Sequence, residues 1–212
     1  MEAAVAKLRD AEYTFHQLEV VDGELQPQQV IQVKFRRPHD VYMTWIGEAY
    51  TGRQLVFRRG MNNGKLMVDP GPWIPSLWLD PLGSLASAGQ RHSVNEVGFV
   101  AVAKLYVADT NKIEADPTRF DPEVTDEGVT VEYGESVHCF TTLLPKDVEP
   151  SFYSLKARTC FSERSDLPVR VQAWDNEDGK VMMVEDYGYE DTRVNVGLVD
   201  LDFDPNNPAY GF

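Results

Sequence analysis

The chain has 212 residues, of which 42% are hydrophobic and 25% are charged, so it is long enough to bury a sizeable core and is expected to form one domain over residues 1–212. Its net charge of −14 argues against nucleic acid as a partner, because binding to nucleic acid depends on cationic contacts to phosphate. No run approaches the roughly 18 consecutive apolar residues that a membrane-spanning helix needs.

The N-terminal stretch "MEAAVAKLRDAEY" is typical of an amphipathic helix, because Ala4, Val5, Leu8 and Ala11 fall on one helical stripe. It contains no apolar core of a signal peptide. Since the sequence starts as if inside a helix, we expect a native targeting segment to precede it.

Strands are expected to follow this helix. The segment "QVIQVKFRR" alternates with a period of two, which places Ile31, Val33 and Phe35 on one face of a sheet. The neighbouring segments with this pattern are "YTFHQLEVVDG", "DVYMTWIG" and "QLVFRRG".

One turn among these strands has a specific signature. Asn63-Gly64 suits a type I′ hairpin turn, which needs a positive φ at both central residues. Strands over 53–61 and 65–69 should therefore be adjacent and antiparallel. Strands in sequence, joined by short turns, make a meander.

The segment "DPGPWIPSLWLDPLG", residues 69–83, is apolar but cannot form a long helix or strand. Two tryptophans, one isoleucine and three leucines lie among four prolines, and proline interrupts both kinds of regular structure. An apolar loop is expected here.

A second helix is expected after this loop. Ser93 and Glu96 have the spacing of a capping box, in which each side chain bonds to the backbone of the other residue. The residues that follow with helical spacing are Val97, Val100, Ala101, Lys104, Leu105 and Ala108.

The second half of the chain predicts another series of strands, after a polar connection interrupted by proline, "EADPTRFDPEVTDEG". The expected strands are "VTVEY", "SVHCFTTLL", "FYSLKARTCF", "VRVQAWD" and "KVMMVEDYGYE". Asp178-Gly179 and the loop from Pro145 to Ser151 have residues typical of hairpin turns.

The two cysteines flank the centre of one predicted hairpin. A loop centred near residue 149 or 150 places Cys139 and Cys160 directly opposite each other on paired strands, within reach of a disulfide. We expect a disulfide; the alternative is two free buried thiols in a reducing cell, because disulfides are rare in the cytosol.

Strands, then a helix, then strands again, all antiparallel, predict an α+β fold in which helices cover one face of a large sheet. Twist accumulates from strand to strand, so a sheet of this size should be strongly curved. A curved sheet with helices on its concave side encloses a cavity.

The sequence carries no motif of a known catalytic centre, and we expect no enzyme. There is no Gly-x-Ser-x-Gly, no phosphate-binding glycine-rich loop and no His-Glu-x-x-His, and the four histidines, His16, His39, His92 and His138, are scattered. In Arg91-His92-Ser93, the serine is better explained as a helix cap. No cofactor is expected.

The segment "DLDFDPNN" is the nearest match to a metal site. A calcium-binding loop that starts at Asp200 would need glycine at its sixth position and glutamate at its twelfth, where this chain has Pro205 and Gly211. We therefore expect no metal, and an edge strand in which Leu201 and Phe203 point into the core while the aspartates face water.

The C-terminal run "LPVRVQAWDNEDGKVMMVEDYGYEDTRVNVGLVDLDFDP" resembles the closing strands of the LolA-like lipoprotein-carrier superfamily, including a hydrophobic-x-Asn segment at Asn195 and an ending from Phe203 to Pro205. The order of helix, meander, helical insertion and second meander is similar as well. The segments "VIQVKFRRPHDVYMTW", "GKLMVDPG" and "FDPNNPAYGF" look closer to a bacterial domain-of-unknown-function family within that superfamily.

This resemblance implies an incomplete β-barrel with an apolar interior in the bacterial periplasm, with or without a membrane anchor. It places Trp73, Ile74, Leu77 and Trp78 at a lid or cavity mouth, whereas the alternative is that they close the core beneath a loop. The alternation of the strands makes Phe35, Met43, Trp45 and Phe57 candidate lining residues, provided that the register is correct.

Two functions remain open. The first is a non-catalytic, monomeric carrier or sensor that holds a lipid, an acyl chain or a lipidated peptide in an apolar cavity. The second is a structural or interaction subunit of the cell envelope with a self-filled cavity. In that case the 23 acidic and 9 basic residues of 107–212 would dock a partner, although acidic residues more often cover a solvated face.

Overall fold

The computed structural model describes residues 1–145, 152–177 and 180–212. The strands are β1 (Asp10–Val21), β2 (Glu24–Leu25), β3 (Gln29–Arg36), β4 (Asp40–Trp45), β5 (Gln54–Arg58), β6 (Leu66–Asp69), β7 (Leu77–Leu79), β8 (Glu123–Glu132), β9 (Glu135–Leu143), β10 (Lys156–Ser162), β11 (Pro168–Glu177) and β12 (Lys180–Val194). The α-helices are α1 (Glu2–Ala6), α2 (Ser84–Ser87) and α3 (Phe99–Ala115), and the 3-10 turns are η1 (Asn62–Gly64), η2 (Val94–Glu96) and η3 (Asp200–Phe203).

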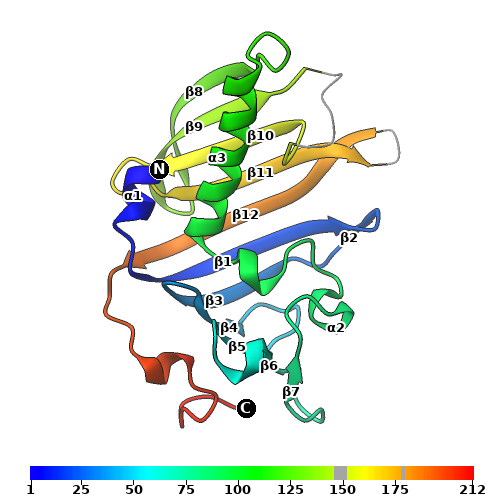
Figure 1. Ribbon diagram of the computed structural model, residues 1–212, viewed down its shortest axis with the longest axis vertical. Coiled ribbons are helices and arrows are strands. Elements are labelled where there is room, and N and C mark those ends of the chain that lie inside the picture. Colours follow the sequence, from blue (N-terminus) through cyan, green and yellow to red (C-terminus); the bar gives the residue numbers. More distant parts are fainter. Residues whose placement is uncertain (146–151, 178–179) are drawn as a thin grey trace.

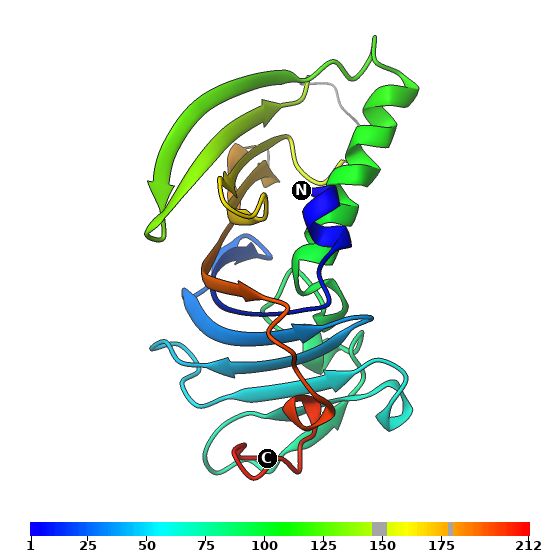
Figure 2. The same ribbon diagram turned by 90° about the vertical axis from the view of Figure 1, so that its left-hand side faces the viewer.

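The twelve strands of the described residues belong to one antiparallel sheet, in the order β7-β6-β5-β4-β3-β1-β12-β11-β10-β9-β8, with β2 paired to β1 (Figure 1). The first meander, β1 to β7, joins the second, β8 to β12, through the pairing of β1 with β12. The sheet is strongly curved, and α1 and α3 lie on its concave side (Figure 2). The expected α+β fold with an incomplete barrel is confirmed.

The core lies between this concave face and the helices. On β3, Ile31, Val33 and Phe35 are buried and share one face, as the alternation predicts. Val5 of α1 and Phe99 of α3 pack into the same cluster. No helix in the described part of the chain is both long and apolar enough to cross a membrane.

The first helix is shorter than expected. It ends at Ala6, and Ala11 lies in β1, paired with Phe35 on one side and Val194 on the other. Hydrogen bonding to two neighbouring strands outweighs the helical spacing of a few apolar residues, which is a weak local preference. Val5 and Leu8 still pack into the core.

The predicted pairing of β5 with β6 is confirmed, but the two-residue type I′ turn is wrong. The last paired residues are Val56 and Met67, and η1 lies in the longer connection between them. Asn62 and Asn63 both have a positive φ there. Asparagine tolerates this conformation, so the Asn-Gly signal marks the turn without setting its length.

The expected contact between Ser93 and Glu96 forms, with the Ser93 N–H donating to the Glu96 carboxylate at 2.9 Å, but it closes a different element. Ser93 and Glu96 cap the 3-10 turn η2, whereas α3 begins only at Phe99, after Gly98. Gly98 has φ 94° and ψ 168°, a conformation that almost only glycine adopts, and this interrupts the helical pattern.

The second meander contains the five expected strands, but β8 begins at Glu123, inside the predicted polar connection. The strand starts this early because β9 extends far enough to pair with it: Glu123 pairs with Leu143 and Val124 with Thr142. Pairing supplies backbone hydrogen bonds to a strand that is exposed on both faces. Asp178-Gly179 and most of the loop from Pro145 to Ser151 lie outside the described residues.

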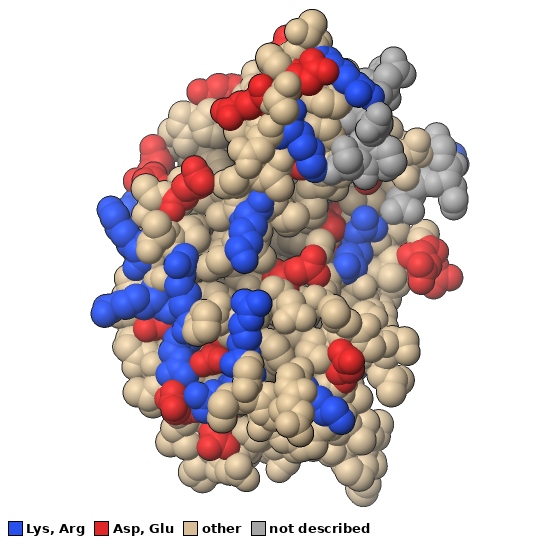
Figure 3. Space-filling view, in the orientation of Figure 1, with Lys and Arg blue, Asp and Glu red and all other residues tan. Residues whose placement is uncertain are grey.

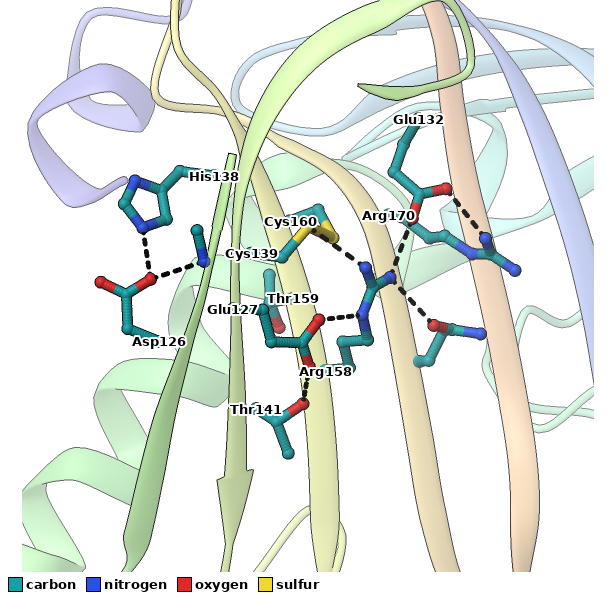
Figure 4. Close-up of a disulfide and its surroundings, with 12 residues drawn as sticks. Asp126, Glu127, Glu132, His138, Cys139, Thr141, Arg158, Thr159, Cys160 and Arg170 are labelled. Atoms are coloured by element: carbon teal, nitrogen blue, oxygen red, sulfur yellow. Dashed lines mark hydrogen bonds and ion pairs between the residues drawn. A yellow bond between two sulfur atoms is a disulfide. The ribbon is translucent and has the colours of Figure 1, made fainter. Parts of the chain in front are cut away.

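Cys139 and Cys160 form the predicted disulfide between directly opposed positions of β9 and β10. Arg158 lies beside it and pairs with Glu127 at 2.8 Å and with Glu132 at 2.9 Å (Figure 4). The disulfide and the ion pairs of Arg158 together hold β8, β9 and β10 to one another near the open edge of the sheet.

The C-terminal segment, residues 195–212, lies across the outer face of β3 and β4 and is called the C-terminal strap. The prediction of an edge strand in this segment is wrong. Asp200 and Asp202 belong to η3 and pair with Arg36 at 2.7 Å and Lys34 at 2.6 Å. Phe203 is fully buried, but Leu201 is half exposed, because a 3-10 turn does not alternate with a period of two. Asn195 acts at the start of this segment, where its Oδ1 accepts a hydrogen bond from the Arg9 N–H at 2.8 Å.

Candidate ligand-binding cavity

A cavity of about 540 Å³ lies between the concave face of the sheet and the segment from α2 to α3. Much of its wall is apolar. The apolar side chains that line it include Met43, Trp45, Leu55, Leu66, Val68, Leu77, Leu79, Val102, Leu105, Ile113 and Phe152. Its volume falls within the roughly 300–1,000 Å³ range of small-molecule sites.

Three of the eight residues predicted to bind a ligand line this cavity: Met43, Trp45 and Leu77. Phe35 and Phe57 share the inward face but lie in the core beside the cavity, where the ring of His39 packs within 6 Å of both. Strand alternation identifies the inward face, but it does not tell which part of that face the helices and loops cover.

The tryptophan loop lies outside the core, at the edge of the sheet. Trp73 is 99% exposed and Ile74 is 54% exposed, while Leu77 and Trp78 of β7 are each about two-fifths exposed. Leu77 also lines the cavity, so the loop is continuous with the cavity wall. The surface over α2 and β7 is mostly uncharged (Figure 3).

One wall of the cavity carries a polar network centred on Glu185 of β12, a side chain that is only 3% exposed. Its Oε1 atom lies 3.0 Å from Arg91 Nε and 3.0 Å from His92 Nε2. The Tyr153 hydroxyl donates a hydrogen bond to Oε2. Arg91 also donates its backbone N–H to buried Glu19 at 3.0 Å.

The pKa values in this network shift in favour of the charged pair. Burial alone would raise the pKa of Glu185, but the hydrogen bond and charge of His92, with Tyr153 and Arg91, hold it below the usual value. Burial would lower the pKa of His92, yet Glu185 raises it. Burial and the Glu185 carboxylate together raise the pKa of Tyr153 far above the usual value.

No motif in the sequence marks this network, although its strand residues carry a signal. Gln17 and Glu19 follow Tyr13 and Phe15 at alternate positions of β1, and all four line the cavity. On β12, Glu185 and Tyr187 are likewise at alternate positions of one strand. A carboxylate at an inward position of a strand indicates a buried partner.

The network holds the loop that carries Arg91 and His92 against the sheet. Among the described residues of this network, no nucleophile lies beside a base that is free to accept its proton. His92 has Glu185 at 3.0 Å from Nε2 and Glu96 at 3.6 Å from Nδ1, so both ring nitrogens face carboxylates. The one group of metal-type side chains in the described ranges is Glu132, Cys139 and Cys160, and its sulfurs are bonded to each other.

Comparison with protein families matches residues 8–212 to the family described as "Protein of unknown function (DUF1571)". The chain belongs to this family. No curated protein matches it.

The chain is also similar to several solved structures. A LolA superfamily protein from Nitrosomonas europaea is similar over 93% of this chain and 91% of its own, with 11% identity and a TM-score of 0.42. The Mycobacterium tuberculosis lipoprotein LppX matches over 92% and 93%, with 13% identity and a TM-score of 0.48. A DUF1329 family protein from Desulfovibrio piger matches over 96% and 95%, with 14% identity and a TM-score of 0.40.

Proposed function

We propose that this protein is a non-catalytic binding protein of the cell envelope that holds a lipid, an acyl chain or a lipidated peptide in its cavity. The observation that carries the proposal is the cavity of about 540 Å³, with its largely apolar wall. Burying each methylene group contributes roughly 0.8 kcal/mol. A ligand with a long acyl chain would therefore bind without a large number of polar contacts.

Residues 1–212 act in this proposal as one monomeric unit, with the tryptophan loop at the mouth of the cavity. Trp73 and Ile74 lie beside Leu77, whose side chain reaches both solvent and cavity. Large exposed apolar patches are typical of contact with lipids or other apolar partners. Replacing Trp73 by serine should slow the uptake of a fluorescent fatty acid from vesicles without lowering the melting temperature, because the side chain makes almost no contact with the protein.

The periplasm is the proposed location, and the disulfide supports it. Disulfides persist in oxidising compartments and are rare in the cytosol. Fractionation of source cells with an antibody against this chain tests the location. Recovery in the cytosolic fraction would contradict it.

The binding function is tested by native mass spectrometry of the purified protein, followed by organic extraction and titration with palmitic acid. Leu105 lines the cavity from α3, so Leu105→Trp should reduce the cavity and the affinity for palmitic acid. Ala108 is exposed on the same helix, and Ala108→Trp is the matched control. Failure of the wild type to bind palmitic acid or any extracted lipid would favour a self-filled interaction subunit.

A further inference from the structure

Arg53 is an arginine at an inward position of the first meander. It directly precedes β5, and its carbonyl accepts a hydrogen bond from the Trp45 N–H at 3.0 Å. The period of two places its side chain on the same face as Leu55, and both line the cavity.

The guanidinium of Arg53 pairs with no carboxylate within the described ranges of the chain. Its Nε atom is buried and has no hydrogen-bond partner there. Its closest cation–π contacts are the rings of Tyr50, 4.1 Å from Cζ, and Trp45, at 5.5 Å.

Other half-buried arginines of the sheet differ in this respect. Arg36, Arg158 and Arg170 each pair with two carboxylates, with the shortest distances between 2.6 and 2.8 Å. These three face the outer side of the sheet. Arg53 has aromatic rings in place of carboxylates.

A partly buried cation without an anionic partner is unfavourable, because it has lost solvation that no ion pair replaces. Burial lowers the pKa of Arg53, and only the phenol of Tyr50 acts in the opposite direction. The guanidinium nevertheless stays protonated, and its planar donors match carboxylate and phosphate oxygens. An anion at this position would restore the missing interaction.

We propose that Arg53 binds the anionic headgroup, a carboxylate or a phosphate, of an amphiphile whose acyl chain occupies the cavity. This inference rests on the proposed binding function and adds the class of ligand. Met43 and Leu55 line the cavity beside Arg53 and would contact the first methylene groups of the chain. The rings of Trp45 and Tyr50 hold the guanidinium in place.

The test compares three ligands of equal chain length, palmitic acid, hexadecyl phosphate and hexadecanol, each below its micelle concentration. Calorimetry or fluorescence would measure their affinities for the wild type, Arg53→Gln, Arg53→Lys and Arg59→Gln. Arg59 is exposed just beyond β5, so its variant removes the same charge outside the cavity.

We expect the wild type to prefer one or both anionic ligands over hexadecanol. Arg53→Gln should lower the affinity for the preferred anion by roughly 10- to 100-fold, which is the usual effect of losing hydrogen bonds to a charged group. The affinity for hexadecanol should stay unchanged. Arg53→Lys should retain part of the preference, and Arg59→Gln should bind like the wild type. The stronger of the two anions identifies the headgroup.

Two results separate failure of this inference from failure of the proposed function. Equal affinity of the wild type for all three ligands, unchanged in Arg53→Gln, would overturn the headgroup site and leave the binding function standing. Absence of binding for all three, including hexadecanol, would overturn both. Melting temperatures of the variants show whether they are folded.

Discussion

His92 Nε2 and Glu185 Oε1 lie 3.0 Å apart, although 93 positions separate the two residues in the sequence. His92 belongs to the loop before η2, and Glu185 belongs to β12. Their contact ties the helical segment to the sheet at one wall of the cavity. The ion pair should therefore stabilise the covered form of the cavity.

The pKa shifts of this pair predict how its contribution changes with pH. The pKa of His92 is raised in the folded state, so its contribution is fully present below the unfolded value of about 6.5 and is lost as the pH rises through the folded value. The pKa of Glu185 is lowered, so its contribution is lost only as the pH falls below about 4.3 and through the folded value. His92→Gln should thus destabilise the protein more at pH 6 than at pH 9, as measured by urea unfolding.

His39 is the control for this measurement. Burial lowers its pKa, and its Nε2 lies 2.7 Å from the Val94 carbonyl. The stability that depends on neutral His39 is lost as the pH falls through its folded pKa. His39→Gln should therefore lower the free energy of unfolding less at low pH than at high pH. The same pH dependence for both variants would contradict the two environments described above.

The disulfide predicts a loss of stability on its removal. Cys139 and Cys160 are 21 residues apart, and closing a loop of this length contributes about 3 kcal/mol in the chain-entropy account. Cys139→Ser/Cys160→Ser should lower the free energy of unfolding in urea by about that amount.

Added dithiothreitol supplies the control for the disulfide. It should destabilise the wild type by a similar amount and leave the double variant unchanged. A wild type that shows two free thiols when denatured without reductant would contradict the cross-link.

Phe203 should be the main apolar anchor of the C-terminal strap. Its ring is fully buried against Tyr42 and Val56, with the Arg36 Cζ atom 4.9 Å from its centre. Phe203→Ala should cost about 3–5 kcal/mol of unfolding free energy, the usual cost of removing a buried phenyl ring.

Leu201 offers a matched control in the same turn, because its side chain is 52% exposed. Leu201→Ala should cost less than about 1 kcal/mol in the same denaturation experiment. Equal costs for the two variants would contradict the packing of η3 against the sheet.

Gly98 should resist substitution for two physical reasons. Its φ of 94° is unfavourable for other residues, and an added Cβ would lie 3.1 Å from the buried ring of Phe35. Gly98→Ala should destabilise the protein by roughly 1–3 kcal/mol in thermal or urea unfolding.

Substitution of Gly60 separates the effect of the positive φ from the effect of the contact with Phe35. It also has a positive φ, 79°, but a Cβ added at this position would have no atom within 4 Å, so Gly60→Ala tests the backbone alone. A larger effect for Gly60→Ala than for Gly98→Ala would contradict the close packing on Phe35.

Several elements could be predicted because their signals are local. The alternation of Ile31, Val33 and Phe35 predicts a half-buried strand whatever its neighbours are. The helical spacing from Val100 to Ala108 likewise predicts most of α3. The disulfide followed from the distance of Cys139 and Cys160 from one turn, because antiparallel strands pair symmetrically about it.

Other features depend on partners that the sequence does not place. Ala11 suits a helix or a strand, and only its pairing with Phe35 and Val194 decides between them. Glu123 to Gly128 look like a polar loop until β9 supplies hydrogen bonds. Local preferences are weak, so tertiary contacts decide such segments.

The amino-acid sequence by itself determined the strands, the long helix, the curved sheet and the cysteine pair, because periodicity and spacing are properties of the chain. The tertiary structure alone decided which inward residues line the cavity and which lie in the core. It also brought His92 to Glu185 and left Arg53 facing the cavity without a carboxylate partner among the described residues. These relationships arise from the covering segments and from distant strands, whose positions depend on packing of the whole chain.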